Sequence, residues 1–200
     1  TGVQTCALPI FLLVHEGPTS RVNAECEAIE SMMATLGLCS ADAAAAEGWM
    51  SHRNNVPEWR DLLEQGLIAD TIEVSGTWSQ IDAIYSDVVS ALKTVPDCVN
   101  ASAHSSHVYR SGINLYFTFA SMPEDASVMG DRYLESWDRA LTATAQAGGG
   151  IAHHHGSGRL RRDYLHHDLV AAGIDLLRTL KQAIDPQGIL NPGNLLPSSE

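Results

Sequence analysis

Residues 148–158 read Gly148-Gly149-Gly150-Ile151-Ala152-His153-His154-His155-Gly156-Ser157-Gly158 and place three consecutive histidines between two glycine-rich turns. Glycine accepts backbone angles that other residues avoid, so we expect a loop that holds imidazoles beside a tightly turned backbone. Imidazole titrates near neutral pH, which suits acid–base chemistry or the binding of an anion. The alternative is a solvated histidine run without a function, which the flanking glycines disfavour.

A metal site is another interpretation of the same run. Side chains of adjacent residues alternate in direction along an extended chain, so His153, His154 and His155 are not expected to reach one ion together. Zinc ligands from one segment are usually separated by roughly two to five residues. The sequence therefore predicts no metal site here.

The segments on both sides of the loop have the periodicities of helices and strands. Working outward, the sequence predicts a helix over residues 126–147 that ends at the glycines and a final helix that ends before Asp185-Pro186. Alternating and apolar runs predict strands over residues 67–74, 99–109 and 113–120. Thr77 and Gln80 have the spacing of a capping box, which predicts a helix that continues to Leu92.

The N-terminal part is expected to add a short strand over residues 11–15 and a helix from Thr19 or Ser20 to the glycine at position 37. The sequence has no Gly-rich nucleotide-binding fingerprint after a strand. Strands and helices in this order predict an α+β domain with a largely antiparallel sheet flanked by helices.

The charge balance excludes several classes of protein. The 200 residues hold 12 Lys and Arg against 24 Asp and Glu, for a net charge of −12. Such a chain is a poor electrostatic partner for nucleic acid or anionic lipid. No apolar run reaches the roughly 18 residues that a membrane-spanning helix needs. We therefore expect a cytoplasmic protein, with peripheral membrane association and a homodimer as open alternatives.

Residues 1–10, Thr-Gly-Val-Gln-Thr-Cys-Ala-Leu-Pro-Ile, resemble the translation of a sequencing-library adapter. We assign them to an artefact, expect the protein to continue upstream, and exclude Cys6 from the cysteine count. The three remaining cysteines are scattered and form no Cys-x-x-Cys pair. That pattern indicates neither a disulfide framework nor a zinc site and favours a reducing compartment.

Three stretches together resemble a known family. They are His107-Val-Tyr109 with Gly112-Ile-Asn-Leu-Tyr-Phe-Thr-Phe119, the triple-histidine loop, and Leu180-Lys-Gln-Ala-Ile-Asp-Pro-Gln-Gly-Ile-Leu-Asn-Pro-Gly193. Residues 11–196 resemble the C-terminal domain of the FAD-linked oxidase (vanillyl-alcohol oxidase-like) superfamily, and within it the alkyldihydroxyacetonephosphate synthases. Residues 197–200 form a tail. The resemblance implies FAD as the cofactor and a separate FAD-binding domain, absent from this fragment, as the partner.

The resemblance also implies roles for individual residues. Arg60 matches an arginine near flavin and substrate, Tyr116 matches a catalytic tyrosine, and His153, His154 and His155 match the active-site histidine loop. Asn191 is expected to contact the flavin together with Arg60. Read without the resemblance, Arg60 is an ordinary surface residue and Tyr116 a core tyrosine. The stretch from Glu73 to Trp78 matches a further family segment, which is expected to be structural.

The activity that the resemblance implies is the exchange of the acyl chain of acyl-dihydroxyacetone phosphate for a fatty alcohol, a step of ether-lipid synthesis. The alternative is an FAD-dependent oxidase or dehydrogenase of a 2-hydroxy acid or related alcohol. That branch carries Gly-Asp-Gly-Asn-x-His, whereas this chain has Ser111-Gly-Ile-Asn-Leu-Tyr116. A third hypothesis is a domain that only folds and docks, with no activity of its own.

Overall fold

A computed structural model describes residues 12–40 and 42–196. These residues form two compact units that divide between Pro57 and Glu58, and each is described by itself. The assignments of residues 1–10 to an artefact and of 197–200 to a tail lie outside the described residues.

The first unit contains the helices α1 (Thr19–Leu36) and α2 (Ala43–His52). Helix α1 ends as predicted, because Gly37 takes φ 68° and its N–H bonds back to the last turn. The predicted strand over residues 11–15 is wrong where it can be examined, since residues 12–15 form no regular structure. A strand needs a hydrogen-bonded partner, and residues 12–15 form no bridge to one.

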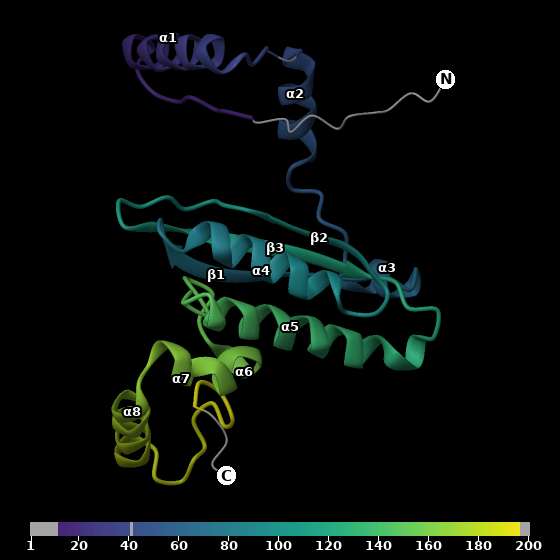
Figure 1. The fold of residues 1–200 in the computed structure, drawn as a ribbon, viewed down its shortest axis with the longest axis vertical. Coiled ribbons are helices and arrows are strands. Elements are labelled where there is room, and N and C mark those ends of the chain that lie inside the picture. The colour runs from purple at the N-terminus through teal and green to yellow at the C-terminus, as the bar shows by residue number, and fades with distance from the viewer. Residues whose placement is uncertain (1–11, 41, 197–200) are drawn as a thin grey trace. The chain divides into compact units, whose positions relative to one another are not determined.

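The second unit is built on a three-stranded sheet with the order β1-β3-β2. Its strands are β1 (Ile68–Thr77), β2 (Cys98–His104) and β3 (Gly112–Ser121), and both pairings are antiparallel (Figure 1). Strand β2 ends five residues earlier than predicted. The backbone N–H groups of Ser106 and His107 donate to the side-chain oxygen of Asn114, which interrupts the ladder until Val108 forms an isolated bridge with Ile113.

Two helices, α4 (Ile81–Lys93) and α5 (Met129–Gln146), pack on one face of this sheet. A short helix α3 (Trp59–Glu64) precedes β1, and a 3₁₀ turn (Ala126–Val128) precedes α5. The core lies between sheet and helices and is formed by buried apolar side chains: Ile72, Val74, Ile84, Val88, Leu92, Leu115, Phe117, Phe119, Trp137, Ala140 and Leu141. The predicted α+β class with an antiparallel sheet and flanking helices is confirmed.

Side chains alternate along each strand, so the residues between the core positions point to the other face of the sheet. We call this the open face, because α4 and α5 do not cover it. Glu73 and Tyr116 are directly paired there, and Tyr116 is also paired with His104 of β2. The open face therefore collects polar and titratable side chains from all three strands.

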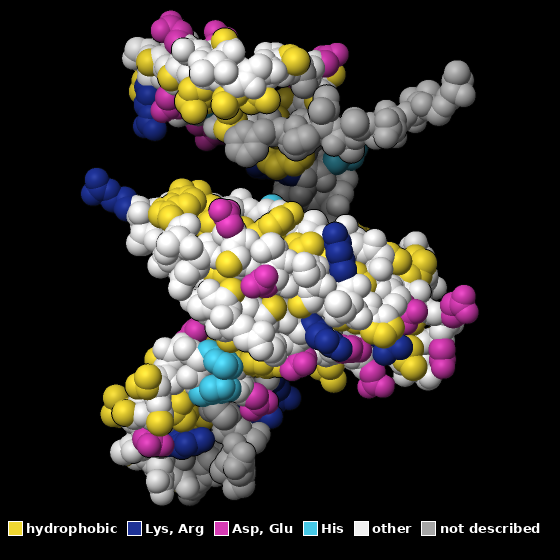
Figure 2. All heavy atoms as spheres, viewed as in Figure 1, with side chains coloured by type: hydrophobic (Ala, Val, Ile, Leu, Met, Phe, Trp, Pro, Cys, Tyr) yellow, Lys and Arg dark blue, Asp and Glu magenta, His cyan; other side chains and the backbone are white. Residues whose placement is uncertain are grey.

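After the histidine loop the chain continues through α6 (Gly158–Arg161), a 3₁₀ turn (Arg162–Tyr164), α7 (Leu165–Asp168) and α8 (Ala171–Ile184). Helix α8 stops where predicted. Asp185 is buried and its carboxylate accepts hydrogen bonds from the backbone N–H groups of Ile189 and Leu190. On the face drawn in Figure 2, charged side chains of both signs are interspersed and form no single basic patch.

Candidate active site

The triple-histidine loop is anchored to β1 at its glycine-rich beginning. Gly150 exchanges two backbone hydrogen bonds with Ser75, of 2.8 and 3.0 Å. Gly148 has φ 78°, and its carbonyl accepts a 2.9 Å bond from the Gln80 side chain at the start of α4. A Cβ on Gly149 would lie 3.1 Å from the Ser75 carbonyl oxygen and 2.8 Å from Ile84. The glycines therefore allow the loop to lie directly against the sheet.

Arg161 holds the loop in place from within the fold. Its side chain is buried, and its guanidinium donates to the carbonyl of Ile151 at 3.0 Å and to that of Glu73 at 3.3 Å. It also lies over the Trp137 ring, 4.7 Å from the centroid. Burial lowers the pKa of the Arg161 guanidinium, and the charge of Glu73 opposes that shift. This arginine supports the loop and is not solvated.

Glu73 is the centre around which the loop folds. Its side chain is fully buried on the open face of the sheet. Oε2 accepts the backbone N–H groups of His154 and His155 at 3.1 and 3.2 Å, and Oε1 accepts the Asn114 amide at 2.9 Å. A buried carboxylate is stable only when such donors surround it. The carboxylate is thus fixed in orientation by both the strand and the loop.

The same contacts determine the protonation state of Glu73. Burial by itself would raise the pKa of this carboxyl, because it penalises the charged form. The hydrogen bonds from Asn114, His154 and His155 outweigh that effect and lower the pKa to about 2. Glu73 is therefore a permanent negative charge at the base of the histidine loop.

Tyr116 lies beside the loop with its hydroxyl between two imidazoles. Its oxygen is 3.1 Å from Nε2 of His154 and 3.2 Å from Nε2 of His155. The His104 ring stacks on the Tyr116 ring, with 5.1 Å between centroids. Desolvation and the nearby charge of Glu73 raise the pKa of the Tyr116 hydroxyl. The phenol is protonated at neutral pH, and both partly exposed imidazoles can exchange a proton with it.

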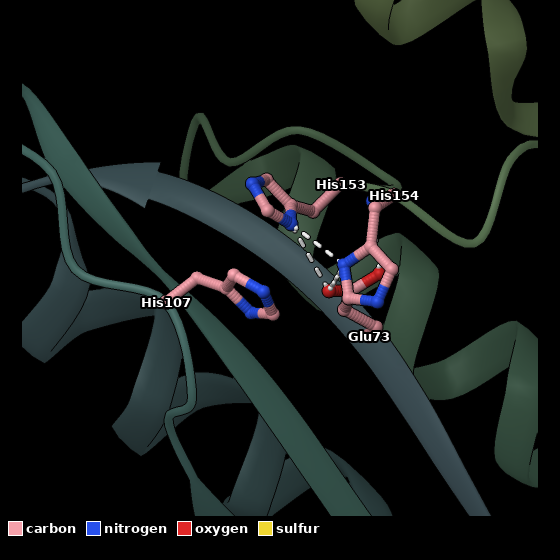
Figure 3. A group of neighbouring side chains, drawn as sticks. All are labelled: Glu73, His107, His153 and His154. Carbon is pink, nitrogen blue, oxygen red and sulfur yellow. Dashed lines mark hydrogen bonds and ion pairs between the residues drawn. The ribbon is translucent and has the colours of Figure 1, made fainter. Parts of the chain in front are cut away.

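Two neighbouring histidines also converge on Glu73, contrary to expectation. The Nδ1 atoms of His153 and His154 lie 3.2 and 2.7 Å from Oε1 of Glu73 and 3.0 Å from each other (Figure 3). Adjacent histidines diverge when the chain is extended, whereas residues 153–155 bend. The predicted divergence of these histidines is therefore wrong. The side chain of His107 also faces Glu73, His153 and His154.

The sequence and the fold of this chain were compared with those of known proteins. A family model described as "FAD linked oxidases, C-terminal domain" matches residues 2–195. The chain belongs to the FAD-linked oxidases. The family and its cofactor, FAD, were both predicted from the loop and the flanking motifs, and both predictions are confirmed.

Individual relatives of this FAD-linked oxidase domain are longer than the chain. It is 31% identical over 206 residues to the uncharacterized FAD-linked oxidoreductase YgcU of Escherichia coli K12, covering 94% of this chain and 41% of that protein. It is 26% identical over 196 residues to alkyldihydroxyacetonephosphate synthase of Dictyostelium discoideum, covering 94% of this chain and 32% of that protein. The chain thus spans less than half the length of these relatives.

A solved structure of an alkyldihydroxyacetonephosphate synthase has the same fold as this domain. The TM-score is 0.56 at 24% identity, over 88% of this chain and 30% of that one. The shared fold agrees with the family that the sequence match gives. Among residues 12–40 and 42–196, no helix is both long and apolar enough to cross a membrane.

Two predicted site residues form no hydrogen bond or ion pair with the histidine cluster in the described part of the chain. Arg60 is exposed on α3, which precedes Ile68 of β1. Ile68 and Glu73 are five residue steps apart, which is about 17 Å of strand. Asn191 is exposed in the C-terminal segment and has φ 46°. Tyr116 and the three histidines are brought together, whereas the flavin contacts of Arg60 and Asn191 remain predictions.

Three residues of the cluster were not predicted as functional. Glu73 was expected to be structural, and His107 and Asn114 were quoted only as parts of a motif. A signal for Glu73 exists in the strand itself, because it stands between Ile72 and Val74, which are buried in the core. Only the antiparallel pairing with β3 reveals that it shares a face with Tyr116. Its burial depends further on the fold of a loop about 80 residues away.

Proposed function

We propose that this domain is the C-terminal part of an FAD-dependent enzyme of the alkyldihydroxyacetonephosphate synthase type. In the proposed reaction, the acyl chain of acyl-dihydroxyacetone phosphate is exchanged for a fatty alcohol. The main support is the Tyr116 hydroxyl held between Nε2 of His154 and Nε2 of His155. The hydroxy-acid branch has a histidine at the position of this tyrosine.

The cluster can move a proton at the carbon next to the substrate carbonyl. A phenol whose pKa is raised is a weak acid alone, so it needs a partner that accepts its proton as it takes one from the substrate. Nε2 of His155 is within hydrogen-bond distance of the phenol and is partly exposed. His154 bridges Glu73 and Tyr116 through its two ring nitrogens, which fixes the orientation of the ring.

FAD fits the chemistry of the Tyr116 phenol and the neighbouring imidazoles. FAD, when bound, supplies a ring that accepts and returns an electron pair beside the substrate. The phenol and imidazoles lie on the open face of the sheet, and we propose that the FAD-binding part of the intact protein covers this face. Arg60 and Asn191 would contact the flavin or the substrate phosphate, since a guanidinium is always charged and binds phosphate well.

A 2-hydroxy-acid oxidase is the alternative function. The residues at 111–116 keep the asparagine of that branch's motif but lack its aspartate and histidine. Asn114 hydrogen-bonds Glu73 and the backbone of the 105–107 segment, so its presence has a structural reason in either enzyme. The missing aspartate and histidine therefore favour the synthase.

The intact protein, expressed with its FAD-binding part, separates the two functions. It should incorporate a labelled fatty alcohol into acyl-dihydroxyacetone phosphate and release the fatty acid without net reduction of the flavin. Anaerobic bleaching of the flavin by a 2-hydroxy acid, without alcohol incorporation, would establish the alternative. Neither reaction in flavin-loaded protein would refute both.

A further inference from the structure

We propose that His104 is a positioning residue whose imidazole sets the plane of the Tyr116 phenol and so aims its hydroxyl at the histidine loop. The two rings stack with 5.1 Å between their centroids and an angle of 6° between their planes. This inference rests on the proposed function, because it concerns the hydroxyl to which we assign the proton transfer. It brings β2, which pairs with Tyr116 on the side opposite Glu73, into the site.

Hydrogen bonds to the hydroxyl leave the plane of the phenol ring undetermined. Rotation about the Cβ–Cγ bond of Tyr116 turns the ring about an axis that passes through the hydroxyl oxygen, so the contacts of 3.1 and 3.2 Å to His154 and His155 survive it. The intrinsic preference of this torsion is broad, because it joins an sp³ and an sp² carbon. The plane matters nevertheless, since conjugation with the ring keeps a phenol hydrogen close to the ring plane. The plane therefore decides which imidazole that hydrogen can reach.

A ring that lies flat against the phenol fixes this plane. In the described part of the chain, His104 is the one ring that lies parallel to Tyr116. The rings of His154 and His155 are inclined to the phenol by 65° and 67°. Their hydrogen bonds thus locate the oxygen atom, while the stack with His104 sets the plane.

The sheet holds His104 where this stack requires it. His104 is the last residue of β2 and is directly paired with Tyr116 of β3. The Cβ atoms of such a cross-strand pair lie about 4.5–5.5 Å apart, so the two side chains leave the sheet side by side. Immediately after His104, the Ser105 hydroxyl and the Ser106 N–H each donate to Oδ1 of Asn114 at 3.2 Å. The backbone of His104 is therefore held by the ladder before it and by Asn114 after it.

His104 contacts the site through the face of its ring. Its side chain is exposed, and among the described residues its ring forms no hydrogen bond to the Tyr116 hydroxyl or to the histidine loop. The role therefore requires a flat side chain and not a titrating nitrogen. An aromatic hydrocarbon ring at this position should serve as well as the imidazole.

Replacement of His104 by a flat and by a small side chain separates stacking from acid–base chemistry. In flavin-loaded intact protein, His104→Phe keeps a flat ring without a nitrogen and should retain kcat within about twofold. His104→Ala removes the stack and should lower kcat about tenfold, with KM changed by less than about twofold, because the proton donor is misdirected. His166→Ala removes an exposed imidazole that stacks on His167 and should leave both constants unchanged.

NMR spectroscopy of the 200-residue chain with ¹³C-labelled tyrosine detects the stack without any reaction. The signals of Tyr116 are assigned by their absence in Tyr116→Phe. The ring current of a stacked ring shifts them upfield in the parent and in His104→Phe, so they should move downfield in His104→Ala. They should stay unchanged in His166→Ala.

The two measurements distinguish failure of the positioning role from failure of the proposed function. Tyr116 signals that are the same in His104→Ala and the parent would overturn the positioning role. Equal loss of kcat in His104→Phe and His104→Ala would also overturn it, as would full kcat in His104→Ala where Tyr116→Phe is inactive. Full turnover of Tyr116→Phe would refute the proposed function, and the NMR shift alone would then decide whether His104 positions the phenol.

Discussion

At the scale of single residues, Tyr133 shows how burial and one charged partner set a protonation state. Its hydroxyl donates a 2.9 Å bond to Oδ2 of Asp70 at the interface between α5 and the sheet. Desolvation, followed by the interaction with Asp70, raises the pKa of Tyr133 from 10.0 to about 12. A raised folded-state pKa means that this stabilisation is complete below pH 10 and is lost as the pH rises toward 12.

Tyr133→Phe tests this assignment. At neutral pH the variant should have a free energy of unfolding about 1 kcal/mol below that of the parent, because a partly buried hydrogen bond to a carboxylate is lost. The difference should shrink between pH 10 and about 12, where the parent loses the same bond. Urea unfolding at both pH values measures it. A difference that is independent of pH would contradict the assignment.

Arg161 provides a second prediction about a single side chain. Arg161→Met should lower the free energy of unfolding by about 3 kcal/mol, because buried carbonyls of Ile151 and Glu73 lose their donor. Arg159→Met, at an exposed neighbouring position, should change it by less than about 0.5 kcal/mol. Urea unfolding of both variants measures the contrast. Equal effects would mean that Arg161 does not anchor the loop.

At the scale of elements, the contact between the glycine run and β1 determines where the histidines lie. Gly149→Ala places a methyl group 3.1 Å from the Ser75 carbonyl and should destabilise the fold by about 2 kcal/mol. Gly130→Ala is the control, because no atom lies within 4 Å of the added methyl group in α5. That variant should gain about 0.5 kcal/mol of stability. Urea unfolding that shows the same loss in both variants would contradict the close approach.

Helices and strands with strong local patterns could be predicted from the sequence, and their limits depended on tertiary contacts. Helix α5 and strand β3 agree with the predicted ranges to within a few residues. The contact between Thr77 and Gln80 that a capping box predicts is present, but the helix begins later than this motif predicts. Gln80 accepts the Thr77 N–H at 3.1 Å, yet α4 begins only at Ile81. Gln80 also donates to Gly148, a partner that no local pattern reveals.

The candidate site was predictable in part for the same reason. Tyr116 and the histidines belong to sequence motifs, so the resemblance to a family identified them. That Glu73 belongs to the site can be recognised only from the strand pairing. That Asn114 belongs to it can be recognised only from its bonds to the 105–107 segment. The convergence of His153 and His154 requires a bent loop over a buried carboxylate. Long-range geometry of this kind is not encoded in a local pattern.

At the scale of the whole molecule, the chain has the C-terminal domain of the FAD-linked oxidases and is shorter than its relatives. It spans 41% of one relative and 32% of another. We expect the intact protein to be purified with the absorbance of bound flavin, whereas the 200-residue chain alone should bind added FAD weakly or not at all. Absorbance after gel filtration measures both. Colourless intact protein that cannot be loaded with FAD would contradict the proposed architecture.

The central claim is that the Tyr116 hydroxyl, held by His154 and His155, carries out the proton transfer. The most direct test is the turnover of flavin-loaded intact protein with Tyr116→Phe, beside Tyr85→Phe as a matched control. Tyr85 packs against Phe117 on the opposite, helix-covered face of the sheet. Tyr116→Phe should lower kcat at least about a hundredfold with flavin content unchanged, and Tyr85→Phe should leave kcat intact. Undiminished turnover in folded, flavin-loaded Tyr116→Phe would contradict the claim.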